Sequence, residues 1–178
     1  MRLLLTGTPG CGKTALAGKL ARLLKAKLVD VNDIIEKKRI FRKNARGEKV
    51  VDLRKLEKIL KGILRKEKNV VVDSHLLCEL KLPCDRIIVL RCEPLVLKKR
   101  LDRRKYPAWK VRDNVLAELL DYCAIQAVGN YLKKKVVEVD FTKPFSAGKV
   151  LAKRKSDEIN WMGAFNSVNK AVGALKTR

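Results

Sequence analysis

The segment Gly7–Thr14, with the sequence GTPGCGKT, constrains the fold of this chain more than any other. It matches the pattern G-x-x-x-x-G-K-[ST], in which backbone N–H groups surround a phosphate group. A short apolar run, Leu3–Leu5, precedes it, and leucines at helical spacing follow within Lys13–Leu24. A strand, a glycine-rich turn and a helix in this order predict a phosphate-binding loop. The alternative is a plain glycine-rich turn between a strand and a helix.

Each fixed position of this loop has a chemical reason. Gly10 and Gly12 allow backbone conformations and a close approach that side chains would prevent. The ammonium group of Lys13 can reach the β- and γ-phosphates of ATP, and the hydroxyl of Thr14 can bind Mg²⁺. The loop therefore predicts ATP and Mg²⁺ as cofactors.

Two further candidates follow a second buried strand, Val70–Val72. Asp73 stands where a carboxylate that holds Mg²⁺ is expected, either directly or through water. His75 is the only histidine, and it lies at the carboxyl end of the strand, where sites of α/β proteins form. We expect His75 to position a water molecule or to contact phosphate. A capping aspartate and a structural histidine remain as alternatives.

Apolar runs alternate with helical patterns along most of the chain. Continuous runs are typical of strands that are buried on both faces of a parallel sheet. The predicted strands are Leu3–Leu5, Leu28–Val31, Val70–Asp73, Ile87–Leu90 and Val136–Val139, and the predicted helices are Lys13–Leu24, Asp52–Leu64, Pro94–Arg104, Asp113–Lys133 and Ser146–Arg154. This order predicts an α/β P-loop NTPase fold, a doubly wound, five-stranded parallel sheet flanked by helices.

Basic residues greatly outnumber acidic ones. The chain has 42 Lys and Arg against 19 Asp and Glu, a formal net charge of +23. Residues 37–66 contribute 13 basic and 3 acidic side chains, and residues 98–112 contribute 8 basic and 1 acidic. Such an excess favours a polyanionic partner, such as a nucleotide, RNA or an acidic protein face. Arg100 and Arg104 are four residues apart, so one helical face can direct both toward phosphate groups.

Several classes of protein are excluded. No apolar run approaches the roughly 20 residues that span a bilayer, and the N-terminus lacks the pattern of a signal peptide. The five cysteines are odd in number and contain no Cys-x-x-Cys pair, so neither a disulfide framework nor a zinc site is expected. We therefore expect a soluble cytoplasmic protein, with reduced thiols and no membrane partner.

Three other stretches sharpen the interpretation of the loop. They are Asp73–Leu77 (DSHLL), Arg100–Tyr106 (RLDRRKY) and Lys110–Glu118 (KVRDNVLAE). Together with the loop they resemble the adenylate kinase isoenzyme six family, archaeal type. Its members are small adenylate-kinase-like ATPases that assist maturation of the small ribosomal subunit. The resemblance runs from Met1 to about Asp140.

By position, the resemblance implies ATP contacts at Gly10, Gly12, Lys13, Thr14 and Ala15, with Arg104 as a lid arginine on the ATP phosphates. It also implies a monophosphate-binding segment at about residues 30–53 and a short lid at about 103–113, within a nucleoside-monophosphate-kinase-like domain of residues 1–155. Residues 156–178 are expected to form an appendage that either packs on the domain or reaches a partner. Two departures from the family pattern are Lys105, where glycine is common, and Ala15, where a second hydroxyl residue is common.

The resulting expectation is an adenylate kinase (ATP + AMP = 2 ADP) with ATPase activity that acts in small-subunit (16S-type) rRNA maturation. The catalytic candidates are Lys13, Asp73, His75 and Arg104, and Arg100 is a further nucleotide-binding candidate. The resemblance implies universal small-subunit ribosomal protein eleven as a partner, and the net charge is consistent with rRNA contact. AMP or another nucleoside monophosphate is the expected acceptor. The alternative is a basic RNA- or protein-binding assembly factor whose P-loop serves only ATP binding and hydrolysis.

Overall fold

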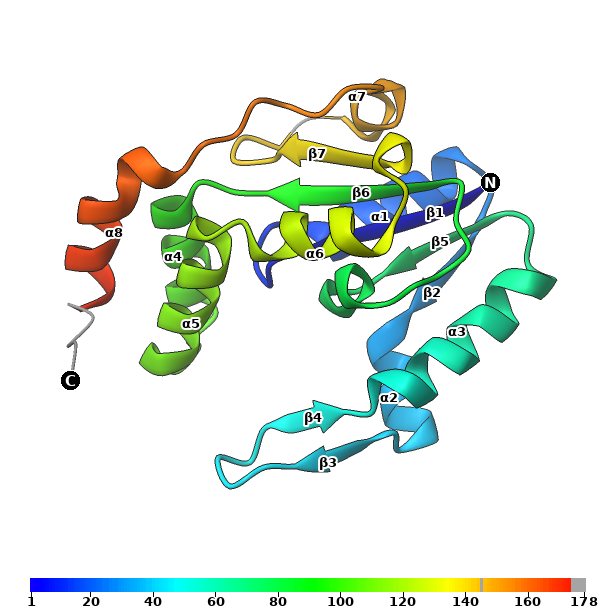
Figure 1. Cartoon of the computed structure of the whole chain (residues 1–178), viewed down its shortest axis with the longest axis horizontal. Coiled ribbons are helices and arrows are strands. Elements are labelled where there is room, and N and C mark those ends of the chain that lie inside the picture. The colour runs from blue at the N-terminus through cyan, green and yellow to red at the C-terminus, as the bar shows by residue number, and fades with distance from the viewer. Residues whose placement is uncertain (145, 174–178) are drawn as a thin grey trace.

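A parallel β-sheet forms the centre of the molecule (Figure 1). The computed structural model describes residues 1–144 and 146–173. In these residues the sheet has five strands in the order β2-β5-β1-β6-β7, and every neighbouring pair is parallel. The strands are β1 (Arg2–Gly7), β2 (Lys27–Asp30), β5 (Val70–Asp73), β6 (Arg86–Arg91) and β7 (Val136–Asp140). The predicted fold class, a doubly wound α/β sheet, is confirmed.

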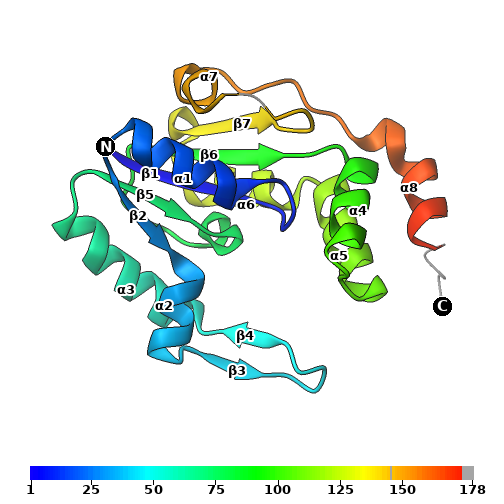
Figure 2. The same ribbon diagram turned by 180° about the vertical axis from the view of Figure 1, so that it is seen from behind.

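Helices cover both faces of this sheet (Figures 1 and 2). They are α1 (Lys13–Leu23), α2 (Val31–Lys38), α3 (Leu53–Lys66), α4 (Pro94–Arg103), α5 (Ala108–Leu119), α6 (Tyr122–Asn130), α7 (Ala147–Ala152) and α8 (Phe165–Val172), with short 3₁₀ turns at His75–Glu79, Lys133–Lys135 and Met162–Ala164. Side chains of α1, α4, α5, α7 and α8 share one core with one face of the sheet. Those of α2, α3 and α6 share a second core with the other face. Side chains from Leu3 and Leu4 enter opposite cores, as period-two alternation in a strand requires.

Two elements between β2 and α3 were not predicted from the sequence. They are α2 and a hairpin of β3 (Phe41–Lys43) and β4 (Lys49–Val51), whose two strands are antiparallel. None of the residues in β3 and β4 is buried, so the segment shows no apolar alternation. The following helix was predicted well, since Asp52 caps α3 by accepting a hydrogen bond from the backbone N of Lys55 at 3.0 Å.

The prediction of one long helix at 113–133 is wrong. The segment begins earlier, at Ala108, and is divided into α5 and α6 by a turn at Leu120 and Asp121. Asp121 takes a left-handed conformation, with φ of 55°. The guanidinium group of Arg91 binds both the carboxylate of Asp121 and the carbonyl oxygen of Glu118, so the turn is tied to the end of β6. This break lets α5 pack on one face of the sheet and α6 on the other.

The C-terminal segment packs on the domain in the part that is described. Its chain runs along β7, where the backbone N of Asp157 donates to the carbonyl of Glu138 at 3.1 Å. Further on, Val168 of α8 is fully buried in the core that contains α5. Residues 174–178 of the predicted appendage lie outside the described residues.

All five cysteines lie in the described residues, and all are free and buried. This agrees with the expectation that the thiols serve as small core side chains. No group of three or more His, Cys, Asp and Glu residues that could hold a metal ion occurs in the described chain.

Candidate functional site

Glycines shape the loop between β1 and α1. Gly10 and Gly12 have φ values of 97° and 103°, which side-chain-bearing residues rarely adopt. A Cβ atom at Gly10 would also come within 2.8 Å of the Leu97 side chain. Because Gly12 is the N-cap of α1, the positive end of the helix dipole lies at the loop. The loop therefore forms a preorganised site for a phosphate group.

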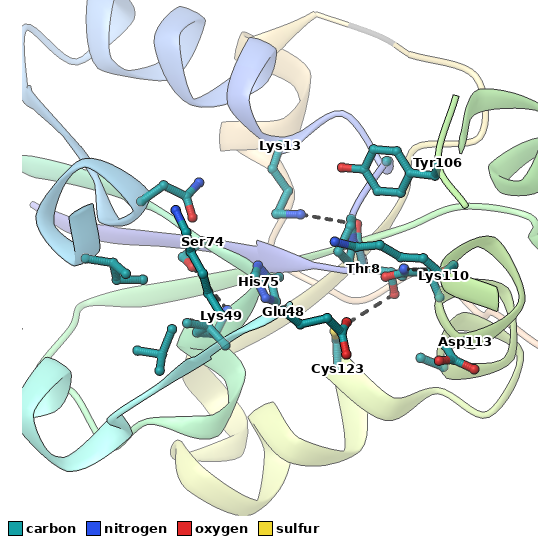
Figure 3. Close-up of a pocket in the computed structure, with 18 of the residues that line it drawn as sticks. Thr8, Lys13, Glu48, Lys49, Ser74, His75, Tyr106, Lys110, Asp113 and Cys123 are labelled. Carbon is teal, nitrogen blue, oxygen red and sulfur yellow. Dashed lines mark hydrogen bonds between the residues drawn. The ribbon is translucent and has the colours of Figure 1, made fainter. Parts of the chain in front are cut away.

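Lys13 is the first residue of α1, and only 9% of it is exposed. Its Nζ atom donates to the carbonyl oxygen of Thr8 at 3.1 Å, so the side chain folds back along the loop (Figure 3). This places the ammonium group where the phosphates of a bound nucleotide would lie.

Asp73 and Thr14 fit the predicted Mg²⁺ site. Asp73 ends β5 beside β1 and is 6% exposed. Among the described residues, its buried Oδ1 atom has no hydrogen-bond partner. Burial raises the pKa of this carboxyl group, and the Thr14 hydroxyl and the charge of Lys13 partly oppose that increase. A buried carboxylate oxygen without a partner, next to a hydroxyl group, is a donor set of the kind that Mg²⁺ prefers.

His75 lies two residues after Asp73, in the first 3₁₀ turn. Its backbone is fixed because its carbonyl oxygen accepts a hydrogen bond from Thr6 Oγ1 at 3.2 Å. Burial lowers the pKa of the imidazole to about 4, and the charges of Lys13 and Lys110 act in the same direction. The ring is therefore neutral at pH 7 and can accept a hydrogen bond from water.

These residues meet in one cleft of about 1090 Å³. Most of the residues that the sequence singled out line it: Gly10, Gly12, Lys13, Thr14, Ala15, Asp73, His75 and Arg104. Figure 3 shows the loop residues Thr8 and Lys13, with Ser74 and His75 beside them at the end of β5. Tyr106, Lys110 and Asp113 lie on one side of the cleft, and Glu48 and Lys49 on the other.

Arg100 does not line this cleft. Its guanidinium group donates to the carbonyl oxygens of Thr142 at 2.7 Å and of Cys11 at 3.4 Å. The expectation that Arg100 and Arg104 share a helical face is wrong, because α4 ends at Arg103 and Arg104 follows it. Arg100 thus holds the backbone of the phosphate loop, whereas Arg104 faces the cleft.

The hairpin forms the wall opposite α5. The guanidinium carbon of Arg46, at the hairpin turn, lies 5.8 Å from the ring centroid of Trp109, a cation–π contact that spans the cleft. Glu36 of α2 pairs with Lys49 of β4 and links the two elements. Segments 30–53 and 103–113 were predicted to contribute to the site. The sequence did not predict which individual residues of these segments line the cleft. No periodicity identifies Arg46, Trp109 or Lys110.

The charges of the lining are balanced. Among the described residues that line the cleft, five are Lys or Arg and five are Asp or Glu. The surplus of basic residues in the chain therefore lies outside this lining.

Comparison with known proteins gives one matching family model, described as "AAA domain", over residues 3–121. A protein named "Putative adenylate kinase" from Methanocaldococcus jannaschii is 39% identical over 144 residues, 80% of this chain and 77% of that protein. A protein of the same name from Pyrococcus furiosus is 40% identical over 147 residues, 80% of this chain and 76% of that protein.

Solved structures of similar fold include a gluconokinase from Sinorhizobium meliloti, with a TM-score of 0.58, 14% identity, and coverage of 96% of this chain and 93% of that one. Shikimate kinase from Aquifex aeolicus has a TM-score of 0.53, 20% identity, and coverage of 85% and 94%. These likenesses establish the P-loop kinase fold. In the described residues, no helix has both the length and the apolar character needed to cross a membrane.

Proposed function

We propose that this chain transfers the γ-phosphoryl group of ATP to AMP. The chain belongs to the AAA-domain family and to the family of the archaeal proteins named "Putative adenylate kinase". The products are two molecules of ADP. One observation carries the proposal: the cleft has a phosphate-binding loop at one end and extends, past His75, to a separate wall formed by α2 and the hairpin. A cleft of this form has room for a donor nucleotide and an acceptor nucleotide.

The chain's own residues would position the reaction. Backbone N–H groups of the loop hold the β-phosphate, and Lys13 meets the oxygens that gain charge during transfer. Arg104 lies close enough to the cleft to stabilise the same charge from the side of the lid. Thr14 and Asp73 would hold Mg²⁺, which when bound neutralises charge on the phosphates. Partial burial of the cleft strengthens each of these electrostatic interactions.

The test is product analysis by ³¹P NMR with Mg²⁺, ATP and AMP. The proposal predicts that AMP and ATP disappear together and that two ADP form for each pair. The Lys13→Ala variant, measured at the same concentration, is the control for contaminating kinases. If ATP is converted to ADP and inorganic phosphate while AMP stays constant, transfer to AMP is excluded.

A second function is favoured by where the charge lies. The cleft lining is balanced, and most of the basic residues in 37–66 and 98–112 lie outside it, so nucleotide binding does not account for most of their charge. We propose that this surface docks on RNA phosphates or an acidic protein face during small-subunit maturation, as the resemblance to the adenylate kinase isoenzyme six family implies. Universal small-subunit ribosomal protein eleven is the partner that this resemblance implies. ATP hydrolysis would accompany this function, since the neutral imidazole of His75 can orient a water molecule.

Binding of an rRNA fragment at increasing salt tests this second function. Phosphate contacts predict an affinity that falls steeply with salt concentration. Binding that does not change with salt, or no binding at low salt, would contradict docking on RNA phosphates.

A further inference from the structure

Beneath the phosphate loop lies a buried carboxylate that no step above uses. Glu118 of α5 is 1% exposed. Its Oε2 atom accepts a hydrogen bond from Thr8 Oγ1 at 2.5 Å, and its Oε1 atom accepts from Arg91 Nε at 2.8 Å. Oε1 also lies 3.1 Å from the backbone N of Cys92 and 3.3 Å from the indole Nε1 of Trp161. One carboxylate thus joins the loop, the end of β6 and the C-terminal segment.

The ion pair with Arg91 does not explain this arrangement by itself. The same guanidinium also binds Asp121 and Glu138, so one cation faces three carboxylates. The negative charge of Glu118 therefore depends on neutral donors as well, and a buried charge is costly when such donors are lost. Two of those donors are the hydroxyl of Thr8 and the indole N–H of Trp161.

Thr8 connects this carboxylate to the nucleotide site. Its hydroxyl donates to Glu118, while its carbonyl oxygen accepts from Lys13 Nζ. A shift of Thr8 would therefore move the acceptor that holds the ammonium group of Lys13. Trp161 is 43 residues from Glu118 in sequence, within the segment that was expected to be an appendage.

We propose that Glu118 is a positioning residue that anchors the phosphate loop through Thr8, and that Trp161 completes its hydrogen bonding. By this inference the C-terminal segment supports nucleotide binding from beneath the loop. It rests on the proposed function in so far as the loop binds ATP and ADP. The indole N–H matters here because an aliphatic or phenyl side chain could fill the same space without supplying a donor.

The test changes the donors and not Glu118 itself. A change at Glu118 would remove one of the three carboxylates that bind Arg91 and leave the other buried donors without their acceptor, which could prevent folding. The full-length chain and its variants are titrated with ADP by calorimetry in the absence of Mg²⁺, so that the reverse of the proposed reaction does not contribute heat. Thr8→Val, which removes the hydroxyl, is expected to weaken ADP binding about tenfold, and Thr8→Ser to restore most of it. Trp161→Phe, which removes only the N–H donor and some ring area, is expected to weaken binding about threefold.

A matched control separates anchoring from packing. Val168→Ala creates a cavity under the same C-terminal segment and removes none of the hydrogen bonds of Glu118, so it should lower the melting temperature and leave the Kd for ADP unchanged. In the Thr8→Val background, Trp161→Phe should add little, since both act through one carboxylate.

The outcomes distinguish failure of the anchoring role of Glu118 and Trp161 from failure of the proposed function. If wild type binds ADP but Trp161→Phe has the wild-type Kd, or if Val168→Ala weakens binding as much as Trp161→Phe, the C-terminal segment serves packing and the inference is wrong. If Thr8→Val binds ADP like wild type, the anchoring role of Glu118 is wrong. A wild-type chain that fails to bind ADP overturns the proposed function, and this inference with it.

Discussion

The two walls of the cleft are built in opposite ways. The phosphate wall consists of the loop and the end of β5; its Thr8, Lys13, Asp73 and Ser74 are buried, and hydrogen bonds from several segments hold Thr8 and Lys13. The opposite wall is the hairpin arm, residues 31–51, in which only Val31, Ile35 and Ile40 are buried. The arm is joined to the other side of the cleft by one cation–π contact, among the interactions of the described residues.

This difference indicates that the two walls have different roles in the reaction. A preorganised wall holds charge-stabilising groups in place and loses little energy to rearrangement during transfer. A wall with few buried contacts can open and close around an acceptor at small cost. We therefore expect changes in the phosphate wall to alter turnover, and changes in the hairpin arm to alter use of the acceptor.

The largest effect is expected at Lys13. Replacing it by alanine removes a charge that meets the transferring phosphoryl group, so turnover should fall at least about 100-fold. The melting temperature should stay near that of wild type, because Lys13 donates only to the carbonyl of Thr8 among its described hydrogen bonds. Steady-state kinetics and thermal denaturation measure the two quantities. Near-normal turnover would contradict the assignment of the loop.

A smaller and more selective effect is expected at His75. We predict that His75→Ala lowers ATP hydrolysis in the absence of AMP about tenfold, and transfer to AMP by less, because only hydrolysis needs an oriented water molecule. Both rates can be measured on the same preparation. Equal loss of both would assign His75 to folding or to shared phosphate binding.

On the other wall, Arg46→Ala should raise the KM for AMP about threefold and leave the KM for ATP unchanged, because the variant removes the contact between the hairpin and Trp109. Arg42→Ala is the matched control, since Arg42 is an exposed arginine of the same hairpin that does not line the cleft. A change in the KM for ATP alone would reverse the roles of the two walls.

The last effect concerns the pH dependence of stability and not the reaction rate. The pKa of His75 is about 4 in the folded chain, below its ordinary value of 6.5, so between these values the unfolded chain binds a proton that the folded chain does not. Stability should therefore fall as pH falls from 6.5 toward 4, by up to about 3 kcal/mol from this group. His75→Ala should show a shallower decrease of melting temperature from pH 7 to 4.5. Parallel curves for the two proteins would show that burial of the imidazole has no such cost.

The same contrast explains what the sequence could predict. The phosphate wall follows from local patterns, since the loop, its strand and its helix are contiguous, and Asp73 and His75 follow a continuous apolar strand. The hairpin arm gave no such signal. Its strands are three residues long and carry charged side chains on both faces, so the arm could be placed only as a segment and not as a hairpin.

Contacts between residues that are far apart in sequence are a second reason why parts of the structure could not be predicted. The helical pattern continues through residues 113–130, and the break at Asp121 arises from Arg91, which is 30 residues away. Arg100 was expected to face phosphate on account of its charge, but the carbonyl oxygens of Cys11 and Thr142 bind it instead. Trp161 could not be assigned to packing or to a partner, because its contact with Glu118 spans 43 residues.

The most direct test of the two-wall account is hydrogen–deuterium exchange, with and without a bisubstrate ligand in which two adenosines are joined by five phosphates. The ligand would occupy the donor and acceptor ends of the cleft together. The account predicts that protection of residues 31–51 rises strongly with the bisubstrate ligand, and that a non-hydrolysable ATP analogue alone, which occupies the donor end, produces much less of this change. Protection of the hairpin arm that is the same with the ATP analogue as with the bisubstrate ligand, or absent with both, would contradict a separate acceptor wall.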